Sequence, residues 1–277
     1  MGVLDEDALD EFLDDSPDDA LAMLAEMVGA TDRSLADQAR RLAARLTIAL
    51  ARSGHSGQGV GRLTRRPIGS GGDLDLDASM EAFAAPPSTG SDGGGPRPLV
   101  HDRALLVETG WRRHETALCL LVDRSGSMSG ERLATAAVAA APALNRVPVD
   151  SSVVCFSENA VVVKSQDSPR PIDDVVADVL SLRGFGVTDL GLALRTATDQ
   201  LARSRAARRV AVLLSDCRAT SGGDPLPHAA GIEELVILAP ADDTADAEGF
   251  AAALGARWAP VGGPTDVPAA FMSVLGP

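Results

Sequence analysis

Apolar runs alternate with amphipathic segments after residue 99, and this alternation restricts the fold more than any other feature of the chain. The runs at 116–123, 210–216 and 234–240 are almost entirely Ala, Val, Leu, Ile and Cys. Continuous apolar runs of this length are typical of strands that are buried on both faces. Strands that alternate with helices predict an α/β fold with a doubly wound, mostly parallel sheet.

The remaining segments of this region complete the predicted sheet. Residues 151–157 and 160–164 are separated only by Glu158-Asn159, which predicts a hairpin and therefore one antiparallel edge strand. A short strand is expected at 257–261. Helical periodicity predicts helices at 130–145, 172–182, 190–203, 244–254 and 266–275.

The region before the sheet divides by charge. Residues 1–83 are expected to form a helical N-terminal region, in which 1–32 hold eleven acidic residues and no Lys or Arg. Residues 33–52 are expected to form an Arg-rich amphipathic helix. The acidic segment could pack on this helix or on a basic partner. A short helix is expected within 73–83, and the Pro/Gly/Ser-rich stretch 84–98 is the predicted linker to an α/β domain at 99–277.

Composition excludes several classes of protein. With 25 Lys+Arg against 39 Asp+Glu, the net charge of −14 disfavours non-specific binding to nucleic acid. No apolar run approaches the ~20 residues of a membrane span, and the first residues lack a signal-peptide pattern. The three cysteines lie far apart and form no CxxC pair, which fits a reducing compartment. We therefore expect a cytoplasmic protein without a membrane span.

Oxygen-bearing side chains gather where the predicted strands end. DRSGSMS at 123–129 and SDC at 215–217 each follow a buried strand, and GVTD at 186–189 precedes a helix. The carboxyl ends of parallel strands share one edge of a sheet, where ligands bind. Hard oxygen donors without a His or thiolate pair suit Mg²⁺. The candidate donors are Asp123, Ser125, Ser127, Thr188 and Asp216, with Gly126 permitting the tight turn between the two serines.

These three segments resemble the three motifs of the von Willebrand factor A (VWA) domain. DRSGSMS is similar to the DxSxS motif of its metal-ion-dependent adhesion site (MIDAS), and Thr188 and Asp216 match the second and third motifs in order. The resemblance implies that Ser125, Ser127 and Thr188 bind Mg²⁺ directly, and that Asp123 and Asp216 bind it directly or through water. Mn²⁺ or Ca²⁺ could replace Mg²⁺. A remaining coordination position would take a carboxylate from a partner.

Two neighbouring residues need separate interpretations. Asp189 follows the threonine in many VWA domains, and it either caps the helix that begins at 190 or supports the metal site. Cys217 departs from the family, which usually has Gly after the aspartate. This substitution changes the loop but leaves the expected ligands in place.

The segment before the domain indicates a branch of the family. LDLDASMEAF at 74–83, followed by a Gly-rich linker, is similar to the CoxE-like bacterial VWA proteins, although it lacks their usual Arg. The C-terminal half is also similar to the D subunit of magnesium chelatase. Both groups work with AAA+ ATPases, of the MoxR or chelatase type. The resemblance implies a non-catalytic partner or adaptor of such an ATPase, with a client protein that supplies an Asp or Glu to the metal.

Other interpretations of the same residues stay open. Asp123, Ser125 and Ser127 could only cap a turn and a helix, and the chain could be a scaffold whose metal site stays empty. A metal-dependent phosphatase of the haloacid-dehalogenase type would need Asp at position 125 and a late Lys, but the only Lys is Lys164. A Ser–His–Asp hydrolase would need a well-placed His, and only His228 follows the strand at 210–216. We predict a site that binds and does not catalyse.

Overall fold

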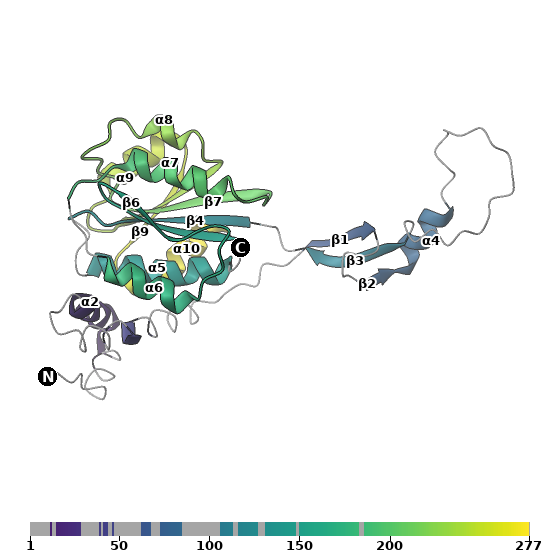
Figure 1. Ribbon diagram of the computed structural model, residues 1–277, viewed down its shortest axis with the longest axis horizontal. Coiled ribbons are helices and arrows are strands. Elements are labelled where there is room, and N and C mark those ends of the chain that lie inside the picture. Colours follow the sequence, from purple (N-terminus) through teal and green to yellow (C-terminus); the bar gives the residue numbers. More distant parts are fainter. Residues whose placement is uncertain are drawn as a thin grey trace. The chain divides into compact units, whose positions relative to one another are not determined.

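The computed structural model describes residues 12, 15–28, 39, 41–43, 46, 62–67, 73–84, 106–112, 116–126, 131–147, 150–182 and 186–276. The chain divides into two compact units. The larger unit comprises Met1–Gly57 and Thr116–Pro277, and the smaller unit comprises Gln58–Glu115. Figure 1 labels the elements of both.

A six-stranded sheet forms the centre of the larger unit, in the order β6-β5-β4-β7-β8-β9. Five strands are parallel, and β6 pairs antiparallel with β5 at one edge. The doubly wound α/β fold with one antiparallel edge strand is therefore confirmed. The strands are β4 (Thr116–Asp123), β5 (Ser151–Phe156), β6 (Ala160–Lys164), β7 (Arg208–Leu214), β8 (Glu234–Pro240) and β9 (Arg257–Val261).

Helices cover both faces of this sheet (Figure 1). One layer contains α5 (Glu131–Arg146), α6 (Ile172–Ser181) and α10 (Val267–Leu275), the last preceded by the 3₁₀ turn η2 (Pro264–Asp266). The other layer contains α7 (Leu190–Leu201), α8 (Leu226–Ala229) and α9 (Ala245–Leu254). All five predicted helices of this region are present, and the short α8 is the one that the periodicity missed. Within the described part of the chain, no helix is both long and apolar enough to span a bilayer.

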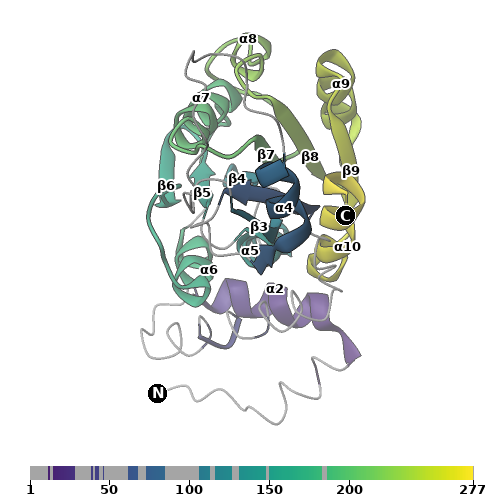
Figure 2. The same ribbon diagram turned by 90° about the vertical axis from the view of Figure 1, so that its right-hand side faces the viewer.

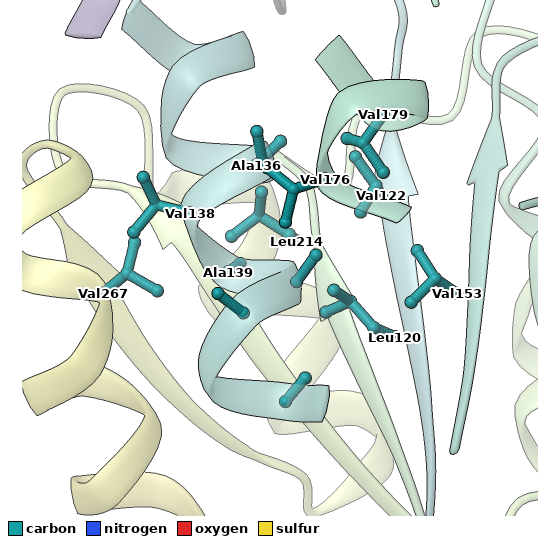
Figure 3. Close-up of a cluster of buried hydrophobic side chains, with 14 of the residues drawn as sticks. Leu120, Val122, Ala136, Val138, Ala139, Val153, Val176, Val179, Leu214 and Val267 are labelled. Atoms are coloured by element: carbon teal, nitrogen blue, oxygen red, sulfur yellow. The ribbon is translucent and has the colours of Figure 1, made fainter. Parts of the chain in front are cut away.

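Side chains of β4 alternate between two buried clusters. Leu118, Leu120 and Val122 face α5 and α6, whereas Ala117, Cys119 and Leu121 face α7. Burial on both faces explains why the run at 116–123 shows no polar alternation. Figure 3 shows the first cluster, in which Ala136 and Ala139 of α5 lie among branched side chains of the strands and of α6. Small residues let α5 pack closely against several neighbours at once.

An N-terminal helix, α2 (Pro17–Val28), belongs to the core of the larger unit. It runs along the outside of the layer that contains α5 (Figure 2). Asp18, from the acidic segment, accepts hydrogen bonds from Thr265 N (2.9 Å) and Thr265 Oγ1 (2.8 Å) just before α10. The described part of the Arg-rich segment is helical at Ala39 and 41–43, and Ala39 is buried in the same core. The acidic segment thus makes at least one contact with a neutral side chain.

The smaller unit is a three-stranded antiparallel sheet in the order β1-β3-β2, with one helix. Its elements are β1 (Arg62–Pro67), β2 (Asp73–Asp75), α4 (Leu76–Ala84) and β3 (Val107–Arg112). The sequence predicted α4 with its lead-in but not β1 or β3. Neither of these strands shows an alternation of apolar and polar residues strong enough to identify it.

Asp75 connects three elements of the smaller unit. Its Oδ1 accepts from Ala78 N at the start of α4 (2.9 Å), and its Oδ2 accepts from Arg65 Nε on β1 (3.0 Å) and Thr109 Oγ1 on β3 (2.8 Å). The bonds from Ala78 and Thr109 hold the pKa of this carboxyl below its usual range. The LDLD sequence therefore places α4 on the sheet. The predicted linker, apart from Ala84 at the end of α4, lies outside the described residues, and the predicted domain boundaries stay a prediction.

A bidentate ion pair at the start of β8 gives a pH-dependent prediction. Glu234 accepts from Arg208 through both oxygens (2.7 and 2.8 Å) and also contacts Arg257, and the bonds from Arg208 lower the pKa of Glu234. A lowered pKa in the folded state stabilises the fold above the unfolded value of 4.5 and loses that effect as the pH falls. Glu234→Gln should lower the free energy of unfolding by about 1 kcal/mol at pH 7, because the pair is partly exposed, and by much less at pH 3.5.

Urea unfolding at the two pH values measures this difference. Glu233→Gln is the matched control, because Glu233 contacts Arg209 at 3.5 Å with a side chain that is 58% exposed. An equal loss of stability at both pH values in Glu234→Gln would show that the carboxylate charge contributes nothing.

Candidate metal site

The candidate site lies where the strand order of the sheet reverses. From β4 the chain continues to β5 and β6 on one side, and β7, β8 and β9 follow on the other side. β4 ends at Asp123, and Asp216 lies two residues beyond the end of its neighbour β7. Ligands of doubly wound sheets bind outside the carboxyl ends of the strands at such a reversal. The topology therefore brings the first and third motifs together.

Asp123 is fully buried and held in one orientation. Its Oδ1 accepts from Ser125 N (2.8 Å), and its Oδ2 accepts from Ser215 Oγ (2.6 Å). The same Ser215 Oγ accepts from Cys217 N (3.0 Å). One hydroxyl therefore connects the carboxylate at the end of β4 to the loop that carries Asp216.

Hydrogen bonds join the second motif to the first motif and to the loop that follows the third. Gly126 N donates to Gly186 O (3.4 Å), which links the first loop to the second. Thr188 O accepts from Thr220 N (3.1 Å) and Ser221 N (3.2 Å), and Thr188 N donates to Thr220 Oγ1 (2.8 Å). The three sequence segments therefore meet at one place.

Most of the predicted donors are described by the structure. Ser125, Thr188 and Asp216 are all buried and lie in loops that hydrogen bonds join to that of Asp123. Ser127 lies outside the described residues. The carbonyl of Gly186 lies 4.0 Å from the place where a side chain on Gly126 would begin, which is an ordinary van der Waals distance, so this neighbour leaves room for a larger residue.

Asp189 caps α7. Its Oδ1 accepts from Leu192 N (2.8 Å), which satisfies a backbone donor in the first turn of the helix. Gly222, with a φ of +83°, passes so close that an added Cβ would lie 2.2 Å from the Asp189 carboxylate. The capping role foreseen for Asp189 is thus present, and its role in supporting a metal stays a prediction.

Electrostatics at the site favour a cation. Burial raises the pKa of Asp123, the hydrogen bonds from Ser215 and Ser125 lower it, and the nearby Asp216 raises it again. Two buried carboxylates repel each other, and a divalent cation between them would offset both the repulsion and the desolvation. Among the described residues, no group of three or more His, Cys, Asp or Glu could hold a metal. Hydroxyl groups would have to complete the ligand set, and the buried hydroxyls here fit the oxygen chemistry of Mg²⁺.

Two residues that support the site were not predicted to do so. Ser215 belongs to the third segment but was assigned no role, and Thr220 was also assigned none. Both act through hydrogen bonds, Ser215 on the carboxylate of Asp123 and Thr220 on the backbone of Thr188. Ser215 gave one usable signal, because it is a polar residue between an apolar strand and a candidate ligand. The partner of Thr220 is 32 residues away and cannot be read from a linear pattern.

Cys217 has left-handed backbone geometry, with a φ of 62°. This conformation favours glycine and costs other residues about 1–2 kcal/mol, so Gly would be the less strained residue at this position. The side chain is buried, and its burial raises the pKa of the thiol. The thiol is therefore protonated at neutral pH, which disfavours a redox role.

The stability of variants at Cys217 should depend on how well each residue tolerates a positive φ. Cys217→Gly removes the steric cost but also some packing, so its stability should equal or exceed that of the wild type. Cys217→Val adds a β-branched side chain at positive φ and should cost about 2 kcal/mol. Thermal unfolding of the three proteins gives the order, and a Val variant as stable as the wild type would contradict this account of the loop.

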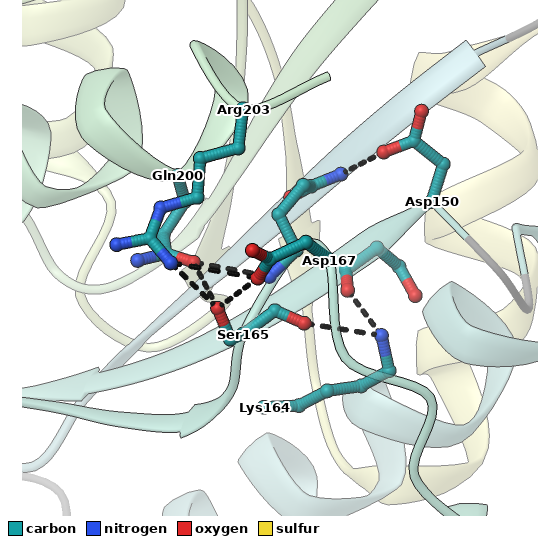
Figure 4. A network of polar contacts seen from close by, with 8 residues as sticks. Asp150, Lys164, Ser165, Asp167, Gln200 and Arg203 are labelled. Carbon is teal, nitrogen blue, oxygen red and sulfur yellow. Dashed lines mark hydrogen bonds and ion pairs between the residues drawn. The ribbon is translucent and has the colours of Figure 1, made fainter.

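The single lysine lies at the opposite end of the sheet. Lys164 is buried, and its Nζ donates to Ser151 O at the start of β5 and to Ser165 O. Figure 4 shows the surrounding network, in which Gln166 Nε2 donates to Asp150 Oδ1 (2.6 Å). Ser151 is five strand positions before Phe156, the residue that pairs with Asp123, a separation of about 16 Å. Lys164 therefore lies too far away to assist chemistry at Asp123.

Of the four histidines in the sequence, His228 is the one that the structure describes. His228 lies on α8, and its Nε2 is 2.9 Å from Arg195 Nη1 of α7. This contact engages one ring nitrogen with a guanidinium group. Lys164 is thus remote from Asp123, and the described histidine contacts a guanidinium group.

Several solved structures are similar to the chain. The von Willebrand factor type A protein from Catenulispora acidiphila is 19% identical, with a TM-score of 0.46, over 60% of this chain and 43% of that one. An aerotolerance-related membrane protein from Bacteroides fragilis is 15% identical, with a TM-score of 0.47, over 58% and 98%. The mussel byssus proximal thread matrix protein 1, with a zinc-occupied MIDAS motif, is 12% identical, with a TM-score of 0.45, over 58% and 47%.

Sequence comparison identifies the family. No curated protein matches the chain. The family model described as "VWA domain containing CoxE-like protein" matches residues 39–261, which is more than half of the chain and includes described elements of both compact units. The match also contains all three motif segments. The chain therefore belongs to the CoxE-like family of VWA-domain proteins.

Proposed function

We propose that this protein binds partner proteins through Mg²⁺ and acts as a non-catalytic partner or adaptor of a MoxR- or chelatase-type AAA+ ATPase. The observation that carries the proposal is the hydrogen-bonded convergence of the three motif segments. Ser215 joins the first segment to the third, and Thr188 joins the second segment to the loop that follows the third. The three segments would not be expected to meet in this way if each motif only capped its own turn.

The ligand assignment follows the family motifs. Ser125, Ser127 and Thr188 would bind the ion directly, and Asp123 and Asp216 would bind it directly or through water. The ion would supply a positive centre to which an oxygen ligand can bind. Ser215 would keep the Asp123 carboxylate in position, since its hydroxyl donates to Oδ2.

Charge balance supports a carboxylate from outside. The two carboxylates and one divalent ion sum to zero, so one further Asp or Glu would give a single net negative charge. The coordination positions that the chain leaves open would go to water or to that side chain, because Mg²⁺ prefers octahedral oxygen coordination. The client or the ATPase would supply the acidic residue.

The ATPase assignment rests on the family. The sequence has no GxxxxGK[ST] phosphate loop, so ATP hydrolysis would have to come from the partner. AAA+ ATPases of this kind are intracellular, and we propose a cytoplasmic location for the complex. The adaptor role would serve protein remodelling or the maturation of a metalloenzyme.

Affinity capture from the native cell tests the partner. The tagged full chain should capture an AAA+ ATPase in Mg²⁺ and lose it in EDTA, and Asp123→Asn should capture none in either buffer. Asp189→Asn is the matched control, since Asn also caps helices. Equal capture by wild type and Asp123→Asn, with and without EDTA, would overturn the proposal.

An activity assay separates this proposal from a metal-dependent phosphatase. We expect no turnover of p-nitrophenyl phosphate above background in Mg²⁺ or Mn²⁺. Turnover that is present in the wild type and lost in Asp123→Asn would instead assign the site to catalysis.

A further inference from the structure

A pocket of about 240 Å³ opens at the edge of the sheet that carries the candidate metal site. Its floor consists of Leu214, Ala239 and Val261, at the carboxyl ends of β7, β8 and β9. Arg132 of α5, Ala241 and Asp242 stand among the residues that line it. The pocket therefore opens at the same edge of the sheet as Asp123 and Asp216.

The pocket and the metal site share one strand. Leu214 lines the pocket, and Asp216 follows it two residues later, a separation of about 7 Å along an extended chain. The loop after Asp216 is also fixed to the loop that borders the pocket. Arg218 forms ion pairs with Asp243 (3.1 Å), which directly follows the pocket residue Asp242, and with Asp246 (3.0 Å) in α9.

The lining identifies the kind of occupant. The floor is apolar and buried, whereas the border carries an ion pair between Arg132 and Asp242 (2.8 Å), in which the Asp242 side chain is 71% exposed. Pockets for drug-sized ligands hold about 300–1,000 Å³, so this volume suits one side chain of the size of Leu, Met or Phe. An apolar anchor in a pocket with a polar border is a common arrangement in protein recognition.

We propose that this pocket binds an apolar side chain of the partner polypeptide, two or three residues away from the acidic residue that completes the metal site. The inference rests on the proposed function, because the acidic residue fixes the position of the partner. Two or three residues of extended chain span about 7–10 Å, which matches the spacing between Asp216 and the pocket floor. Partners would therefore carry Asp or Glu followed or preceded at this spacing by Leu, Met or Phe.

A blocking variant tests the pocket without disturbing the metal ligands. Ala241 lies exposed at the border, and its backbone N donates to Val261 O (2.9 Å), a bond that any side chain but proline leaves in place. Ala241→Trp should fill the opening, and Ala241→Ser is the matched control. The probe is a random heptapeptide library displayed on phage and selected on the full chain in Mg²⁺, followed by synthesis of the enriched peptides.

We expect the enriched peptides to combine an acidic residue with an apolar residue at the stated spacing. Ala241→Trp should weaken these peptides at least tenfold, and Ala241→Ser should not. Alanine at the apolar peptide position should weaken binding tenfold to the wild type but much less to Ala241→Trp, as expected for two groups in direct contact.

The outcomes separate this inference from the proposed function. Peptides that need Mg²⁺ and Asp123 but have no apolar preference, or that bind Ala241→Trp normally, would overturn the pocket assignment and leave the metal-dependent function standing. Peptides that bind equally in EDTA and to Asp123→Asn, or a failure to enrich any Mg²⁺-dependent peptide, would overturn both.

Discussion

Asp123→Asn is expected to eliminate the stabilisation of the protein by Mg²⁺. A ligand at 100 times its Kd stabilises the folded state by about 2.7 kcal/mol, and for a domain of this size 1 kcal/mol shifts Tm by about 2–4 °C. Wild-type protein should therefore gain about 5–10 °C in saturating Mg²⁺. The variant keeps the size of the side chain and can still accept from Ser125 N, but it lacks the charge that the ion requires.

Thermal unfolding after chelator treatment, with and without Mg²⁺, measures this effect. Asp216→Asn should behave in the same way, and Asp189→Asn should keep most of the shift because its role in capping α7 survives the change. A full Mg²⁺ shift in Asp123→Asn would contradict the ligand assignment. Loss of the shift in Asp189→Asn alone would make Asp189 part of the metal site.

Leu120→Ala is expected to give a large loss of stability. Leu120 is fully buried in the centre of β4, between the neighbouring strands β5 and β7 and beneath α5 (Figure 3). Truncation of a buried leucine removes its transfer free energy and leaves a cavity, at a cost of about 2–5 kcal/mol. The alanine-rich α5 has few long side chains that could move into the space, so we expect about 4 kcal/mol.

Urea unfolding of the full chain measures the change. Leu226→Ala on α8 is the matched control, since that side chain is 37% exposed, and it should change the free energy of unfolding by about 0.5 kcal/mol or less. A loss below about 1 kcal/mol in Leu120→Ala would show that the face of the sheet beneath α5 is not closely packed.

The sheet of the larger unit could be predicted from sequence because burial leaves a strong pattern. The runs that became β4, β7 and β8 are apolar without interruption, as strands buried on both faces must be. The Glu158-Asn159 pair identified the hairpin for a similar reason, since it separates two apolar runs by only two residues.

Elements with few buried side chains could not be predicted in this way. β1 reads RLTRRP and β3 reads VETGWR, and neither repeats an apolar residue at every second position. Their pairing depends on long-range contacts, such as those of Asp75 with Arg65 and Thr109. The packing of α2 in the larger unit likewise involves distant segments, among them Thr265, whose hydrogen bond with Asp18 spans 247 residues.

The residues of the candidate site also fall into two groups, those that a sequence pattern indicates and those that depend on long-range contacts. Asp123, Ser125, Thr188 and Asp216 could be proposed as ligands because each stands beside a recognisable strand or helix in a known motif. The bonds of Ser215 and Thr220, and the positive φ of Cys217, depend on how loops from distant segments fold against one another. Motifs thus identify the groups that would contact the ion, whereas the residues that position them require coordinates.

Anomalous diffraction from crystals grown in Mn²⁺ shows whether the buried oxygens at the end of β4 bind a metal ion, because Mn²⁺ can occupy oxygen sites that bind Mg²⁺. We expect one strong peak among the oxygens of Asp123, Ser125, Thr188 and Asp216, within about 2–3 Å of at least two of them, and no peak there in Asp123→Asn. Crystals with saturating Mn²⁺ and no density at this position would contradict this expectation.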